Sequence, residues 1–154
     1  MRLDLICVGQ LKERYLRDAY AEYAKRLGRY VDFHCVEIKD CPDRIPDLRA
    51  KAEEAAGIIA KVPAKSYVIA MDERGQQMDS LHFSELLFEG FEQGQSQLSF
   101  IIGGSRGLDD SLRQSADALV SMGKMTMSHQ IFRIVLLEQI YRAFKIHYGE
   151  PYHK

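Results

Sequence analysis

The chain of 154 residues is 46% hydrophobic and 28% charged, a composition typical of one soluble globular domain with an adequate core. We therefore expect a single domain over residues 1–154. The sequence has no apolar run of bilayer-spanning length and no secretory signal pattern, which excludes a membrane-spanning class and favours a cytoplasmic location. The net charge of −1 argues neither for nor against nucleic acid as a partner.

The first half of the chain predicts three strands and two helices. Residues 2–9 and 66–72 are apolar enough for buried strands, and residues 31–38 alternate with the period of a strand. Residues 12–27 place three tyrosines on the apolar stripe of an amphipathic helix. Core packing is the commoner use of such a stripe, and stacking on bases is the alternative. A second helix is expected at 47–61, and the polar stretch after Met71 is expected to be a loop.

The second half continues the alternation. Either Asp79 or Ser80 can cap a helix that runs to about Phe91, and a strand is expected at 97–102. A short helix with acidic residues in its first turn follows Leu108. A strand at 118–123 and a long helix at 129–147, capped by Ser128, complete the set.

This alternation predicts an α/β fold in which a mainly parallel sheet is sandwiched by helices. In such sheets, ligands bind outside the carboxyl ends of the strands. Three loops fall at that edge, after Met71, Ile102 and Val120. We therefore expect the binding site where these loops converge. The three cysteines lack the spacing of a metal site, so no metal is expected.

The loop GGSRG, residues 103–107, decides which ligand is expected there. It lacks the Gly-Lys-Ser/Thr ending of a P-loop and the spacing G-x-G-x-x-G, so a phosphate site is poorly supported. Arg106 could meet an anion, although one exposed loop arginine is usually just solvated. The alternative is a ligand read by backbone groups, such as an adenine edge, between apolar walls. Methionines suit such walls and suit core filling equally well. They are Met71, Met122, Met125 and Met127.

The C-terminal third differs from the rest of the chain in its charge and in the pattern of its last helix. Residues 121–154 carry five basic and two acidic side chains, which suggests a face suited to an anion. The helix at 129–147 begins apolar on nearly every side, broken by Arg133, so a partner subunit is expected to cover it. Glu138 and Arg142 are spaced i,i+4, either as a helix salt bridge or, if buried, to position another group.

The chain ends in GEPYHK, which combines a rigid residue, an aromatic ring and a group that titrates near neutrality. Pro151, Tyr152 and His153 fit a tail that folds into a site. A frayed and mobile end is the alternative.

Several of these segments together resemble one family, the SPOUT-class methyltransferases of the ribosomal RNA large subunit methyltransferase H group. These enzymes modify pseudouridine at N3 in 23S ribosomal RNA. The matching segments are LDLICVG near the start, FIIGGSRGL (100–108), SMGKMTMSHQIFRIVLLEQIYRAFKI (121–146) and GEPYHK (149–154). The resemblance runs the length of the chain, and its long C-terminal block is specific.

The resemblance implies a C-terminal trefoil knot, an exception to the rule against threaded loops, and a homodimer built partly on the last helix. It also implies S-adenosylmethionine as cofactor, held in the knot. The implied cofactor-binding residues are Met71, Gly103, Gly104, Met122, Gly123, Lys124, Met125, Thr126 and Met127. Two positions depart from the family pattern, because Met71 stands where leucine is common and Gly123 where serine is common.

Methyl transfer to a ring nitrogen needs in-line positioning, departure of the N3 proton and stabilisation of the developing charge. The implied proton acceptor or relay is His153, and Tyr152 would orient or stack on the target. Arg142 would stabilise the developing negative charge, and Glu138 would orient Arg142. Arg133 and Lys154 would contact phosphates of the RNA.

Two other readings remain open at this point. The chain could be a non-catalytic ribosome-binding factor that uses the same dimer surface, or a phosphate-handling α/β enzyme that binds a nucleotide instead. Its near-neutral charge fits recognition of an assembled ribosome, with the second subunit contributing, better than avid binding of naked RNA.

Overall fold

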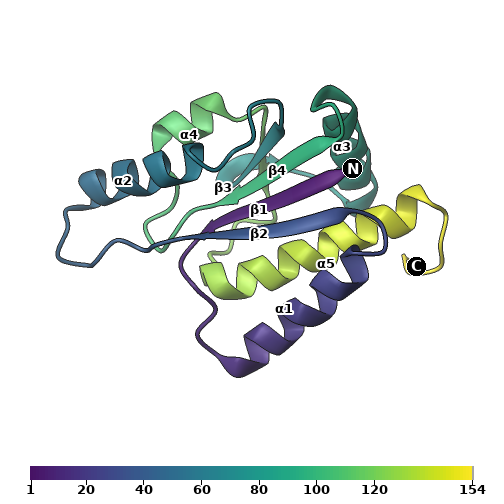
Figure 1. Cartoon of the computed structure of the whole chain (residues 1–154), viewed down its shortest axis with the longest axis horizontal. Helices are drawn as coiled ribbons and strands as arrows, with labels where there is room; N and C mark the ends of the chain where they lie inside the picture. Colours follow the sequence, from purple (N-terminus) through teal and green to yellow (C-terminus); the bar gives the residue numbers. More distant parts are fainter. Residues whose placement is uncertain (154) are drawn as a thin grey trace.

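The computed structural model describes residues 1–153, and its elements alternate as expected (Figure 1). The strands are β1 (Arg2–Val8), β2 (Asp32–Ile38), β3 (Tyr67–Gln77), β4 (Gln97–Ile102) and β5 (Ala118–Ser121). The helices are α1 (Arg14–Leu27), α2 (Asp47–Ile59), α3 (Ser80–Gln93), α4 (Asp110–Ser115) and α5 (His129–His147). The strands form one sheet in the order β2-β1-β4-β3-β5, with every pair parallel. The predicted α/β class is therefore confirmed.

Helices cover both faces of this sheet, and each face has its own core. On one face, alternate residues such as Leu5, Met71 and Phe100 pack with α1, α3 and α5. On the other face, residues of the opposite parity, such as Ile6 and Ile101, pack with α2 and α4 (Figure 1). Strands buried on both faces read as continuous apolar runs, which explains the appearance of β1 and β4 in the sequence.

The main difference from expectation lies in β3, which continues to Gln77 through a stretch expected to be a loop. Its pairing with β5 shifts between Met71 and Gln76, so that both residues oppose Val120 and the residues between them bulge out. Gly75 allows the return to the ladder, because a Cβ there would lie 2.5 Å from the Val120 carbonyl carbon. Bulges of this kind are frequent beside active sites.

The tyrosine stripe and the helix caps match the expectations in part. Tyr20 and Tyr23 pack against the core as expected, whereas Tyr15 is 67% exposed and does not. The Asp79 side chain caps α3 by accepting from the His82 N–H at 2.9 Å. Ser128 is the N-cap residue of α5 but makes no side-chain capping bond.

Among residues 1–153, no helix combines the length and apolarity needed to cross a bilayer.

Candidate functional site

The three loops expected to form the site start side by side. Met71 of β3 pairs with Ile102 of β4 and with Val120 of β5, so the segments that follow them leave the same edge of the sheet. The expected convergence is confirmed. Met71 is only 5% exposed, and its side chain belongs to the core packed by α5. Met71 therefore offers little surface to a ligand at this edge.

The glycine loop after β4 folds back on itself. Gly104 and Gly107 form an isolated antiparallel bridge, and Gly107 has a φ of +77°. A Cβ on Gly103 would lie 2.8 Å from the Gly107 carbonyl carbon. Gly103 is therefore required by close packing within the loop, and Gly107 by its positive φ.

Arg106 does not lie free in solvent as a loop arginine usually does. Its side chain is 11% exposed, its Nε donates to Asp47 at 2.8 Å, and its Nη1 donates to the Cys41 carbonyl at 3.2 Å. The guanidinium is thus used to tie the glycine loop to the segment before α2. This leaves no free arginine in the loop for a phosphate.

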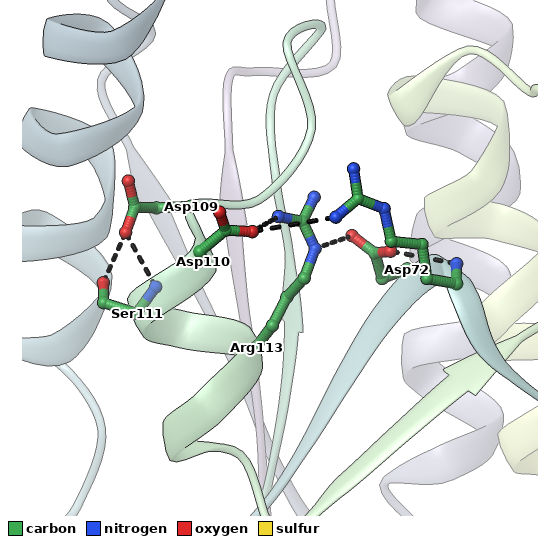
Figure 2. Close-up of polar contacts among 6 residues, drawn as sticks. Asp72, Asp109, Asp110, Ser111 and Arg113 are labelled. Atoms are coloured by element: carbon green, nitrogen blue, oxygen red, sulfur yellow. Dashed lines mark hydrogen bonds and ion pairs between the residues drawn. The ribbon is translucent and has the colours of Figure 1, made fainter.

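A second arginine lies on the other side of the same loop. Arg113 of α4 donates from Nε to Asp72 at 2.8 Å and from Nη1 to Asp110 at 2.6 Å (Figure 2). Asp72 directly follows Met71, and its side chain is 4% exposed. Sequence reasoning missed both residues, because 41 positions separate them and no spacing rule joins them.

The expected cofactor segment after β5 is open to solvent at its far end. Met122 is half-buried and lines a cleft of about 200 Å³ with Phe83, Val120 and Val135. Gly123 has a φ of +140°, a conformation that favours glycine, which suits its departure from the family's serine. The rest of the segment is exposed, Met125 to 86% and Met127 to 37%, together with Lys124 and Thr126.

The C-terminal tail folds onto α5, so the frayed alternative is wrong for the described residues. The Tyr152 hydroxyl donates to Glu138 Oε1 at 3.0 Å, and Arg142 Nη2 donates to the same oxygen at 2.6 Å. The Arg142 guanidinium carbon lies 4.8 Å from the centroid of the Tyr152 ring. Burial, together with the bond to Glu138, raises the pKa of the Tyr152 hydroxyl. His153 is exposed, with Nδ1 3.5 Å from Arg142 Nη1.

A residue that sequence reasoning missed links this tail cluster to the cleft. Gln139 donates from Nε2 to Glu138 Oε2 at 2.6 Å and accepts from the Ser80 hydroxyl at 3.1 Å. Gln139 and Ser80 both line the cleft with Met122. Among residues 1–153, no hydrogen bond or ion pair joins the tail cluster to the glycine loop or to residues 122–127.

The expected phosphate contact of Arg133 does not fit its position. The residue is 1% exposed, donates from Nη1 to Glu37 at 2.7 Å and from Nη2 to the Gly9 carbonyl at 2.9 Å, and its Nε has no partner. A guanidinium enclosed between α5 and β1 has no surface to offer to RNA. The expected contact of Arg133 with RNA phosphates is therefore wrong. The other expected contact, Lys154, lies outside the described residues.

Metal-ligating side chains do not gather at this edge. Residues 1–153 contain no group of three or more His, Cys, Asp or Glu side chains placed to hold an ion. All three cysteines are free thiols, and the Sγ atoms of Cys7 and Cys35 are 3.9 Å apart.

Comparison with known proteins agrees with this arrangement. The family model described as a predicted SPOUT methyltransferase matches residues 1–153. Proteins named ribosomal RNA large subunit methyltransferase H are 45% identical in Streptococcus uberis and 47% identical in Streptococcus pyogenes, each over the full length of both chains. Among solved structures, a probable methyltransferase from Bordetella pertussis aligns with a TM-score of 0.59 at 12% identity, over 92% of this chain and 95% of that one. A probable methylase family protein from Haemophilus influenzae aligns with a TM-score of 0.57 at 11% identity, over 99% and 70%.

Proposed function

The chain belongs to the SPOUT methyltransferase family, and on this premise we propose that it methylates N3 of a pseudouridine in 23S ribosomal RNA, on the assembled ribosome, with S-adenosylmethionine as methyl donor. The observation that carries the proposal is full-length identity of 45–47% to proteins named for methylation of large-subunit ribosomal RNA. Family membership also implies the C-terminal trefoil knot and a single domain over the whole chain.

The residues at the sheet edge fit this cofactor better than a phosphate ligand. Arg106 in the glycine loop and Arg113 on the helix that follows it are both engaged by carboxylates, so neither is available as a phosphate clamp. The cleft beside Met122 combines apolar walls, such as Phe83 and Val135, with polar groups such as Ser80 and Gln139, and Met125 and Met127 are exposed nearby in sequence. Flexible apolar side chains left open in this way suit contact with an adenosyl group.

S-adenosylmethionine supplies an electrophilic methyl group on a sulfonium, and the chain then has to position the base and remove its proton. We assign proton removal from N3 to His153, which is accessible at the end of the tail. Arg142 is held rigidly by Glu138 and lies beside His153, where its charge can stabilise the carbonyl oxygens of the target base. Tyr152 orients this pair through its bond to Glu138.

We also propose that the protein is a homodimer built partly on α5. Ile131 of this helix is 49% exposed, and Ile134 and Val135 are half-buried without belonging to either core. An apolar face of this kind fits a second copy of the chain. An Ile134→Glu variant is expected to run as a monomer in light scattering, whereas an exposed Leu48→Glu variant on α2 keeps the dimer. A native monomer would contradict this part of the proposal.

Calorimetric titration tests the cofactor. The purified native protein is titrated with S-adenosylmethionine and, separately, with ATP. We expect binding of the former alone. Binding of ATP alone would favour a phosphate-handling enzyme, and binding of neither would favour a non-catalytic ribosome factor. A His153→Ala variant should bind the cofactor as the native protein does and lose methyl transfer, whereas full turnover by this variant would remove His153 as the proton acceptor.

A further inference from the structure

Asp72 occupies an unusual place, because its buried carboxylate begins the bulge in β3. Its side chain is 4% exposed, and both of its oxygens are used. Oδ1 accepts from the Arg74 backbone N–H at 3.0 Å, which shapes the first turn of the bulge, and Oδ2 accepts from Arg113 Nε at 2.8 Å (Figure 2). A buried carboxylate requires a charged partner of this kind.

Arg113 reaches this carboxylate from a different part of the chain. It lies on α4, the helix that follows the glycine loop, and its side chain is 15% exposed. Its Nη1 also binds Asp110 at the start of α4. Its Nη2 lies 3.9 Å from the point where a Cβ of Gly107 would stand. The guanidinium therefore binds Asp72 at the start of the β3 bulge and Asp110 at the start of α4, and it lies beside Gly107 at the exit of the glycine loop.

The strand ladder alone does not fix these loops. β3 and β4 pair as far as Met71 and Ile102, and beyond this point the two chains diverge. One chain bulges through residues 72–75 and the other turns through residues 103–109. The Arg113–Asp72 ion pair joins the residue directly after Met71 to α4, the helix that follows the glycine loop, so it links the β3 bulge to the segment that carries this loop.

We propose that Arg113 is a positioning residue of the cofactor site, which acts by tying the start of the β3 bulge to α4 and thereby fixing the glycine loop relative to Met71. The inference rests on the proposed function in placing the cofactor at these loops. Arg113 acts through Asp72 and the loop backbone.

The chain offers a matched control within the same cluster. Arg74 carries the same charge, and its Nη1 lies 3.7 Å from the same Asp110, but its side chain is 66% exposed and makes no side-chain bond to Asp72. Exposed pairs of this kind contribute little. Arg74→Gln therefore removes an equal charge from the same cluster and leaves the Arg113–Asp72 ion pair intact.

Calorimetry and initial rates with ribosomes are measured for the native protein, Arg113→Gln, Arg113→Lys and Arg74→Gln. We expect Arg113→Gln to weaken cofactor binding about tenfold, with kcat at saturating cofactor largely kept, because the loops can still close on a bound ligand. Arg113→Lys should recover part of the affinity, and Arg74→Gln should stay within about twofold of native. Native affinity in Arg113→Gln would overturn the proposal.

Amide hydrogen exchange separates positioning from a general loss of stability. In Arg113→Gln, we expect faster exchange in residues 72–77 and 103–109 and unchanged exchange in β1 and β4. Equally faster exchange in β1 and β4 would mean that Arg113 only stabilises the fold, and would overturn the proposal. If the native protein binds no S-adenosylmethionine, the proposed function fails, while the exchange measurement still decides whether Arg113 orders the two loops.

Discussion

The enclosed guanidinium of Arg133 makes a quantitative prediction about stability. Arg133→Gln removes the hydrogen bonds to Glu37 and to the Gly9 carbonyl, and a shorter side chain cannot reach both. Each bond from a charged donor contributes about 1.5–3 kcal/mol. The Glu37 side chain is 36% exposed and can hydrogen-bond to water after the substitution, so the bond to Glu37 contributes at the low end of this range. The Gly9 carbonyl, by contrast, loses its buried partner. We expect the free energy of unfolding to fall by about 3 kcal/mol.

Urea unfolding followed by circular dichroism measures this change. The protein concentration has to be fixed, because the stability of the proposed dimer would depend on it. Arg14→Gln serves as control, since that side chain is 89% exposed and should shift the free energy of unfolding by less than about 0.5 kcal/mol. If Arg133→Gln unfolded like the native protein and instead bound ribosomes more weakly, the side chain would lie on the surface and the reasoning would be wrong.

Three further predictions concern the edge of the sheet and the tail. Gly75→Ala should destabilise the protein by about 2 kcal/mol because its Cβ would meet backbone, whereas Gly28→Ala at the end of α1 should be nearly neutral, since Gly28 has a helical φ of −59° and a Cβ there would meet its nearest atom at 3.5 Å; urea unfolding compares the two. Burial lowers the pKa of His129 below its ordinary 6.5, so the unfolded chain takes up the proton first as pH falls. The free energy of unfolding should therefore drop below about pH 6.5, and less so in His129→Gln, as measured by unfolding across that range. Tyr152→Phe should lower kcat for methyl transfer roughly tenfold while cofactor affinity stays constant, because Glu138, which holds the arginine that we propose to stabilise charge, loses one donor.

The fold could be predicted from the sequence because its signals are local. Buried strands of a parallel sheet read as short apolar runs, and amphipathic helices separate them. Apart from β3, the boundaries found lie within two residues of those expected. The extension of β3 was missed because residues 72–77 are polar, and their return to the ladder depends on the close packing of Gly75 against Val120.

The candidate site was predictable in part. The unusual residue types of the tail indicated that it folds, and Tyr152 does bind Glu138. The roles of the arginines were not predictable, because their partners lie far along the chain. Arg106 binds Asp47 across 59 positions, and Arg133 binds Glu37 across 96. From sequence alone, a charged residue on an apolar helix is equally compatible with a surface contact and with a buried ion pair. The position of the facing strand decides between the two.

Methyl transfer to ribosomes tests the central claim most directly. Ribosomes from cells that lack this protein are incubated with the purified enzyme and isotopically labelled S-adenosylmethionine, and the nucleosides of the 23S RNA are analysed by mass spectrometry. The account predicts one new labelled nucleoside, a pseudouridine methylated at N3, and none with His153→Ala. Cofactor binding without any transfer to ribosomes, or label in a different nucleoside, would contradict it.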